Sequence, residues 1–234
     1  MTTMMETAPA IQPDSSPYWR GLPVQSVNAL CELASALQDS DTDAAIWDRT
    51  LPQAFADWLN AIPAERWPQG RFVLRPADIA ACLTEAFAAS QISSAPALTW
   101  FGEDVTHLAE CMQDLSGAPM VRLRLEPVFD DACSKLHIDN VVARMICTYS
   151  GPATELGLDA VTPESAERIP TGAPVLLKGK RWPDAHQPSL RHRSPPIAGT
   201  GQARLVVVLE GCSQAEIYPQ YDTLYPSNNA QPER

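Results

Sequence analysis

The sequence lacks the marks of a membrane-spanning, exported or nucleic-acid-binding protein. No apolar run approaches the roughly 20 residues that cross a bilayer. Residues 1–17 contain neither the cationic start nor the apolar stretch of a secretion signal. Basic residues are few: 17 Lys and Arg stand against 28 Asp and Glu, and the net charge of −11 repels phosphate backbones and anionic lipids. We therefore expect a cytoplasmic protein that binds neither nucleic acid nor membranes.

Paired cysteines and several well-known motifs are also missing. The six cysteines are scattered without a CxxC pair, so no disulfide framework is indicated and we expect reduced thiols, mostly buried. There is no GxGxxG or P-loop, no HExxH, no GxSxG elbow and no EF-hand pattern. Enzyme classes that depend on those motifs are thereby excluded.

The chain does contain enough apolar residues for a large core, since 45% of its 234 residues are hydrophobic. We expect one domain over residues 21–212, between a disordered tail at 1–20 and a flexible tail at 213–234. The first tail is expected because the start of the chain is rich in Thr, Pro, Ser and Ala and shows no periodicity.

Hydrophobic periodicity divides this domain at Gly117. Up to that point apolar residues recur at helical spacing, which predicts a mainly helical part over residues 21–117. Beyond it apolar and polar residues alternate, which predicts mainly strand over residues 118–212. Helices are expected near residues 24–37, 50–59, 76–87 and 105–115, and strands near 121–125, 141–149, 173–177 and 203–210. Helices followed by strands indicate an α+β fold, with a helical N-terminal half packed on a C-terminal β-barrel or sandwich.

Histidine is scarce, and two of the four histidines suggest a metal site. His137 and Asp139 form an H-x-D triplet, whose side chains point the same way in an extended segment and can reach one ion. His192 lies 55 residues further on, just before the strongest predicted strand, and is the best third ligand. Two imidazoles and one carboxylate with open positions suit non-haem Fe(II) and oxygen chemistry. With a bound water the same set suits zinc hydrolysis.

Other interpretations of these residues stand beside the metal site. His137 and Asp139 also fit a structural hydrogen-bonded pair, and His192 fits a residue that caps a loop. Cys133, four residues before His137, is a candidate fourth ligand, although free cysteines more often pack in cores. His107, in a predicted helix, and His186, in a Pro-rich loop, fit exposed positions better than ligand positions.

Arg204 adds a second feature, because it lies 12 residues after His192 inside the last predicted strand. This arrangement is similar to that of the double-stranded β-helix oxygenases, in which a basic residue about one strand beyond the distal His anchors the carboxylate of 2-oxoglutarate. The resemblance implies a double-stranded β-helix-like barrel, with Arg204 as the cosubstrate anchor. A strand arginine with a solvated or paired head group is the alternative.

Several ordered segments also resemble a bacterial family known as domain of unknown function 1826. They read C-S-K-L-H-I-D-N, A-R-M-I-C-T-Y-S-G-P-A-T-E, L-L-K-G-K-R-W-P and H-R-S-P-P-I, followed by R-L-V-V-V-L-E. The resemblance spans residues 47–210 and implies a role in metal homeostasis, because members tend to be encoded near zinc-limitation genes. Residues 153–156 read A-T-E-L where the family often has G-T-E-W, so an aromatic wall of the family is missing here.

These features predict a metal-dependent enzyme. The leading hypothesis is a non-haem Fe(II) oxygenase in which His137, Asp139 and His192 hold Fe(II). Arg204 would bind 2-oxoglutarate, and a small molecule or a protein side chain would be the substrate. The first alternative is a non-catalytic zinc-binding protein of metal homeostasis, with Cys133 closing a four-ligand site. The second alternative is a zinc hydrolase on the same three ligands.

Overall fold

The computed structural model describes residues 19, 21–158, 166–183, 187–213 and 224–225. Most of the two predicted tails, 1–20 and 213–234, lies outside these residues, as does His186. Within the described ranges, no helix combines the length and the apolar character that crossing a bilayer requires.

All helices of the described residues precede Gly117 in the chain. They are the 3₁₀-helices η1 (Leu30–Glu32), η2 (Ala64–Arg66) and η3 (Pro76–Asp78) and the α-helices α1 (Leu33–Leu37), α2 (Gln53–Asn60), α3 (Ile79–Ala89) and α4 (Pro96–Ser116). The longest, α4, begins with a proline in its first turn and ends at Gly117. Gly117 adopts a left-handed φ of 62°, and its N–H donates to the Gln113 carbonyl at 2.8 Å, as in a common helix C-cap.

The strands form two separate sheets. The strands are β1 (Val24–Val27), β2 (Ala44–Trp47), β3 (Gln69–Leu74), β4 (Met120–Val128), β5 (Ala143–Ser150), β6 (Glu155–Gly157), β7 (Glu167–Arg168), β8 (Val175–Lys178), β9 (Arg191–Arg193), β10 (Arg204–Cys212) and β11 (Leu224–Tyr225). The large sheet has the order β1-β2-β8-β5-β10-β4-β3-β11, and the small sheet has the order β7-β6-β9. Every pairing is antiparallel except β1 with β2.

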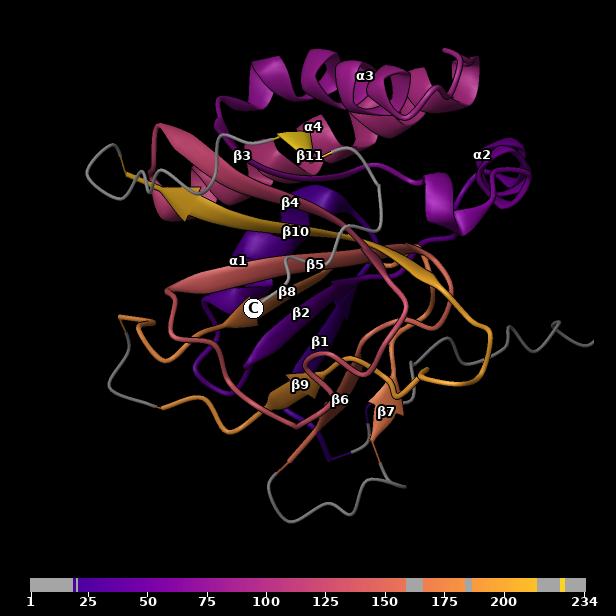
Figure 1. Ribbon diagram of the computed structural model, residues 1–234. Coiled ribbons are helices and arrows are strands. Elements are labelled where there is room, and N and C mark those ends of the chain that lie inside the picture. Colours follow the sequence, from indigo (N-terminus) through magenta and orange to yellow (C-terminus); the bar gives the residue numbers. More distant parts are fainter. Residues whose placement is uncertain (1–18, 20, 159–165, 184–186, 214–223, 226–234) are drawn as a thin grey trace, which may run out of the picture.

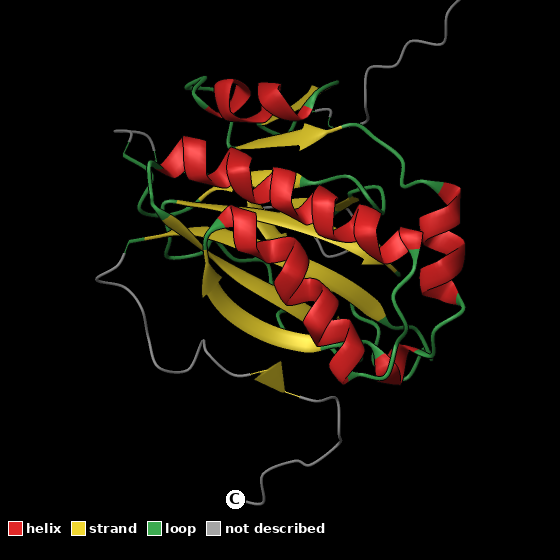
Figure 2. Cartoon of the chain, turned by 90° about the horizontal axis from the view of Figure 1, so that it is seen from above, coloured by secondary structure: helices red, strands yellow, loops and turns green. Residues whose placement is uncertain are grey.

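The large sheet is the middle of three layers (Figures 1 and 2). Alternate residues of β10 face opposite sides, so Leu205, Val207 and Leu209 join a core with the helices. Val206 and Val208 join a second core, which includes Leu156 of β6. The helices therefore cover one face of the large sheet, and the small sheet lies against the other (Figure 1).

The four predicted strands after Gly117 are confirmed as β4, β5, β8 and β10, and the predicted helices near 50–59, 76–87 and 105–115 as α2, α3 and α4. The prediction of one helix over residues 24–37 is wrong, because that segment begins with β1. Its V-Q-S-V sequence also fits alternation, and parallel pairing with β2 buries Val27 in the core.

The separation into a helical half and a barrel also needs correction. β1, β2 and β3 come from the part predicted to be mainly helical, yet all three join the large sheet. The predicted double-stranded β-helix-like barrel is not confirmed: the described strands form one sheet of eight strands and one of three, and neither sheet closes on itself. The observed class is a mixed α/β arrangement around a large, mostly antiparallel sheet.

Candidate metal and cosubstrate site

Backbone pairing brings the two candidate histidines together. His137 precedes β5, His192 lies in β9 of the small sheet, and the two form an isolated antiparallel bridge. The His137 N–H donates to the His192 carbonyl at 3.1 Å, and the His192 N–H donates back at 3.0 Å. Because directly paired residues of antiparallel strands place their side chains on the same face, the two imidazole rings lie with centroids 4.5 Å apart.

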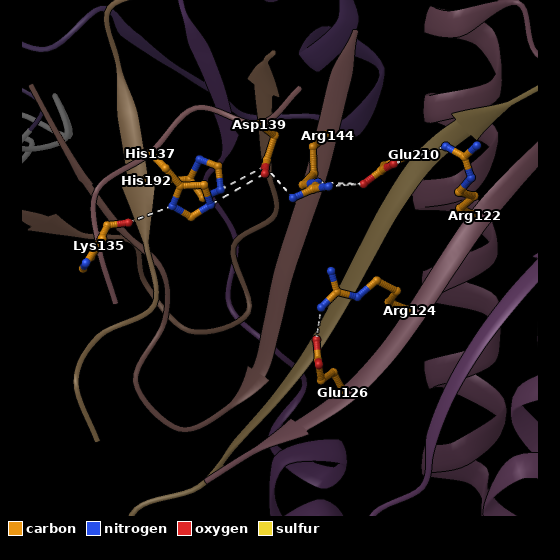
Figure 3. A network of polar contacts seen from close by, with 9 residues as sticks. All are labelled: Arg122, Arg124, Glu126, Lys135, His137, Asp139, Arg144, His192 and Glu210. Atoms are coloured by element: carbon orange, nitrogen blue, oxygen red, sulfur yellow. Dashed lines mark hydrogen bonds and ion pairs between the residues drawn. The ribbon is translucent and has the colours of Figure 1, made fainter. Parts of the chain in front are cut away.

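The carboxylate of Asp139 lies beside the two imidazoles, between them and the guanidinium of Arg144 (Figure 3). Its Oδ1 is 3.6 Å from His137 Nε2, and its Oδ2 is 3.1 Å from His192 Nε2. One ligand atom from each of the three residues lies within 4.8 Å of the others, the only such group among the described residues. Two donors at about 2.1 Å from one ion and at right angles lie about 3.0 Å apart, so the spacing suits one mononuclear ion.

The tautomer of His137 is set by its neighbour. His137 Nδ1 lies 2.7 Å from the backbone carbonyl of Lys135. A carbonyl oxygen only accepts, so Nδ1 must carry the proton and donate. In the neutral ring the lone pair then belongs to Nε2, the nitrogen that faces Asp139. This is the second contact by which proteins commonly orient a metal-binding histidine.

Burial and charge act on these groups in opposite directions. Burial alone would raise the pKa of Asp139, but the contacts with His137 and His192 and the charge of Arg144 hold that pKa far below its usual range. Burial lowers the pKa of His192, whereas the Asp139 carboxylate raises the pKa of His137. A carboxylate with a lowered pKa beside a buried imidazole whose pKa is also lowered is a favourable donor set for a divalent cation.

Arg144 of β5 holds Asp139 from the side away from the imidazoles. Its Nη1 lies 2.5 Å from Asp139 Oδ2, and its Nε donates to Glu210 Oε1 at 2.8 Å (Figure 3). One guanidinium therefore connects the candidate ligand to a carboxylate of β10. The sequence analysis did not single out Arg144.

Arg204, at the start of β10, is buried with few partners. Arg204 is only 1% exposed, and the one hydrogen bond of its guanidinium to a described residue is a long one, 3.4 Å to Thr148 Oγ1. Its buried Nε has no partner among the described residues. The nearest acids are engaged elsewhere, since Glu155 pairs with Arg168 and Arg193, and Glu126 pairs with Arg124. Burial lowers the pKa of Arg204 to about 10.

One cavity of about 90 Å³ between the two sheets joins these groups. His137, His192 and Arg204 all line it, together with the apolar side chains of Ile146, Val206 and Val208. A guanidinium with unused donors thus opens into the same space as the two imidazoles. A buried charge without a partner is costly, so the arrangement suits an anionic ligand.

The other candidate metal ligands, Cys133 and His107, lie outside the group formed by His137, Asp139 and His192. Cys133 lines the same cavity but is not part of the three-residue ligand group. Its backbone is in the left-handed region, with φ 59°, and its carbonyl accepts from Ser194 N–H at 2.9 Å. His107 is exposed on α4, in the helical layer.

The fold and the cluster define a candidate mononuclear metal centre between two β-sheets. The chain belongs to the family described as protein of unknown function (DUF1826), whose model matches residues 28–210. A comparison with curated proteins finds no match.

Solved structures with a similar course of the chain include three proteins. The dioxygenase for auxin oxidation 1 from Arabidopsis thaliana, in a complex with 2-oxoglutarate, is 9% identical, with a TM-score of 0.47 over 82% of this chain and 92% of that one. A prolyl-4-hydroxylase from Pseudomonas putida is 13% identical, with a TM-score of 0.44 over 80% and 100%. T7H from Neurospora crassa, in a complex with α-KG, is 10% identical, with a TM-score of 0.43 over 90% and 91%.

Proposed function

We propose that this protein is a non-haem Fe(II) oxygenase that uses 2-oxoglutarate as cosubstrate. His137, Asp139 and His192 would hold the metal, and Arg204 would bind a carboxylate of the cosubstrate. Three protein donors on one side of an ion, with open positions opposite, suit Fe(II) and oxygen chemistry. The substrate would be a small molecule or a protein side chain.

The observation that carries this proposal is the burial of the Arg204 guanidinium beside the two histidines with few hydrogen-bond partners. Its guanidinium is buried, lines the cavity of the two histidines and makes only one long hydrogen bond within the described residues. Bidentate pairing with a carboxylate is the interaction for which a guanidinium is best shaped. A ligand that carries one carboxylate for Arg204 and a second oxygen pair for the metal fits this combination, and 2-oxoglutarate has both.

The protein's own groups have separable tasks in this proposal. Fe(II) with 2-oxoglutarate and O₂ would supply the oxidising power for attack on a substrate C–H bond. His137 and His192 offer neutral nitrogen donors, and Asp139 offsets part of the metal's charge. Arg144 keeps that carboxylate in place, and the apolar side chains of Ile146, Val206 and Val208 limit water around the reacting groups.

The two alternatives lack comparable support. A closed zinc site needs a fourth protein ligand, and the one cysteine that lines the cavity stands outside the ligand group. Neither the family match nor the solved structures connect the chain with zinc supply. A zinc hydrolase would use the same three ligands but would leave the buried Arg204 without a task.

The proposal is tested by titration of the anaerobic protein with Fe(II) and then with 2-oxoglutarate. We expect a visible charge-transfer band, which forms when the keto acid chelates the bound iron. Arg204→Ala should keep its Fe(II) affinity and lose about tenfold or more in 2-oxoglutarate affinity, since it loses charge-assisted hydrogen bonds.

Arg75→Ala is the matched control, because Arg75 is an exposed arginine that pairs with Asp78 at the start of the helical layer. It should behave as the wild type in both titrations. If the wild-type protein binds Fe(II) but shows no charge-transfer band and no affinity for 2-oxoglutarate, then 2-oxoglutarate is not its cosubstrate. If the wild-type protein does not bind Fe(II), the proposal of an Fe(II)-dependent oxygenase is wrong.

A further inference from the structure

The segment that carries His192 is anchored at its start by one buried carboxylate. Asp43 lies directly before β2 and is 2% exposed. Its Oδ2 accepts hydrogen bonds from Ser189 N–H at 2.7 Å, from Ser189 Oγ–H at 3.0 Å and from Leu190 N–H at 3.0 Å. Leu190 is followed by β9, in which His192 is the middle residue. The backbone that leads into the candidate metal ligand is thus held by a side chain 146 positions earlier than Ser189. We call residues 189–198 the His192 segment.

Asp43 is itself fixed in place, because its backbone bonds to two neighbouring parts of the large sheet. Its N–H donates to the carbonyl of Pro23, the residue before β1, at 2.7 Å. Its carbonyl accepts from the N–H of Lys178, in β8, at 2.9 Å. A carboxylate on so well-bonded a backbone determines where its partner segment lies, since a rigid element positions a site more closely than a loop does.

A second carboxylate anchors the far end of the His192 segment. Asp131, in the connection between β4 and β5, accepts through Oδ1 from Ile197 N–H at 2.7 Å and from Ala198 N–H at 2.8 Å. The same connection contains His137 and Asp139. Asp131 therefore holds the segment of one candidate ligand against the segment that carries the other two.

Backbone pairing alone does not continue along these two segments. The bridge of His137 with His192 is isolated, and the next contact is Ser194 N–H, which donates to the Cys133 carbonyl at 2.9 Å. One segment advances four residues between these contacts and the other only two, so the regular register of an antiparallel ladder is lost. Cys133 has a left-handed φ of 59°, which turns the chain away from an extended course. The Asp131 carboxylate then supplies the acceptor that a continuing strand would have offered.

We propose that Asp43 and Asp131 are positioning residues, which hold His192 at the distance from His137 and Asp139 that one metal ion requires. This inference rests on the metal site of the proposed function, but not on 2-oxoglutarate or on the reaction. Neither Asp43 nor Asp131 belongs to the three-residue ligand group, so each acts through the backbone of the His192 segment. Removal of a group that orients a metal ligand typically weakens metal binding by about 10- to 100-fold.

The test is titration of the full-length, metal-free protein with Co(II), a divalent ion that also accepts nitrogen and oxygen ligands. Its visible absorption reports both binding and the arrangement of the donors. Asp43→Ala should weaken Co(II) binding by about 10- to 100-fold and change the spectrum, because His192 is no longer held in place. Asp43→Asn should lose less, since its amide oxygen still accepts the N–H groups of Ser189 and Leu190.

Asp131→Ala should weaken Co(II) binding by about 3- to 10-fold. The loss is smaller because Asp131 is exposed and its hydrogen bonds compete with water. Since Asp131 lies at the surface, this variant tests the inference even if Asp43→Ala fails to fold.

Two matched controls separate positioning from a loss of charge or of stability. Asp130→Ala removes the neighbouring exposed carboxylate, whose hydrogen bond with Ala132 N–H, 3.0 Å long, stays within its own loop. Asp104→Ala removes a buried carboxylate of α4, in the helical layer on the other face of the large sheet. Both variants should bind Co(II) with the affinity and the spectrum of the wild type, although Asp104→Ala is less stable.

The possible outcomes are distinct. If the wild type, Asp43→Ala and Asp131→Ala bind Co(II) equally and with the same spectrum, the inference is wrong although the metal site is confirmed. If Asp104→Ala loses as much affinity as Asp43→Ala, stability alone controls binding, and the inference is again wrong. A wild-type protein that binds no Co(II) would instead contradict the metal site itself, and the proposed function with it.

Discussion

Arg144 is the residue on which the candidate site depends most, after the three donors themselves. It contacts Asp139 and Glu210 at once, and no other described guanidinium reaches Asp139. We expect Arg144→Gln to lower the affinity for Fe(II) by about 10- to 100-fold, the usual effect of losing a group that orients a metal ligand. Anaerobic competition with a chromophoric chelator measures this affinity.

Arg122→Gln is the control for Arg144→Gln. Arg122 also lies near Glu210, at 3.5 Å, but has no contact with Asp139. Its variant should change Fe(II) affinity less than about threefold. Equal losses in the two variants would show that a general change of charge, and not the hold on Asp139, controls metal affinity.

At this scale, the sequence predicted the residues that stand out by type. His137, Asp139 and His192, which lie together in the structure, could be predicted because an H-x-D triplet and a distal histidine stand out in a chain with four histidines. Arg144 was missed because a polar residue at every second strand position normally faces water. Its contribution depends on the small sheet, which covers that face and could not be foreseen from strand periodicity.

At the scale of elements, the start of β10 is constrained by the turn after β5. Gly151 has φ +77°, and a Cβ built on it would lie 2.0 Å from the Ala203 carbonyl oxygen and 3.1 Å from Arg204 Cα. We expect Gly151→Ala to lower the free energy of unfolding by roughly 3 kcal/mol, since overpacking adds to the strain of a left-handed alanine. It should also lower 2-oxoglutarate affinity, because the backbone that carries Arg204 must move.

Gly117→Ala separates these two effects. Gly117 also has a positive φ, +62°, but a Cβ there meets no atom within 4 Å. It should cost only about 1 kcal/mol and leave 2-oxoglutarate affinity unchanged. Urea unfolding and the anaerobic titration give the two quantities. Similar losses of cosubstrate affinity in both variants would mean that global stability, and not the position of Arg204, sets binding.

The clearest of the correctly predicted elements have a long, unambiguous period. α4 and β10 extend over 21 and 9 residues, respectively, and their patterns exclude the other type of structure. Four of the missed strands, β1, β2, β6 and β9, have three or four residues, too few for periods of 2 and 3.6 to be distinguished, whereas the missed strand β3 has six. Their conformation is determined by pairing with residues distant in the chain.

At the scale of the whole molecule, a buried polar network joins the helical layer to the sheet. Arg49 forms an ion pair with Asp104 of α4, and Tyr149 of β5 donates to Asp104 Oδ2 at 2.5 Å. The Arg49 Nε donates to the Gly172 carbonyl at 2.8 Å. The Arg49 and Asp104 side chains are 10% and 8% exposed, so the pair is largely shielded from water.

We expect Asp104→Ala to lower the free energy of unfolding by about 3–5 kcal/mol, because it leaves the Arg49 charge buried without its partner. The double variant Arg49→Met/Asp104→Leu should lose less, since no buried charge remains. Urea denaturation followed by far-UV circular dichroism compares them. A double variant that loses as much stability as Asp104→Ala, or more, would contradict this expectation.

The bridge between His137 and His192 closes a long loop of the chain, which bears on the stability of the folded protein. Its two hydrogen bonds fasten the ends of a stretch of 55 residues that contains β5, β6, β7 and β8. An ion held by both rings would be a crosslink across the same ends, and it would reduce the entropy of the open chain by closing a long loop. Ions that bind only the folded chain stabilise it by mass action. The stability of the folded protein would then rise with the fraction of sites that hold an ion. If that ion is iron, the iron supply would govern the lifetime of the protein.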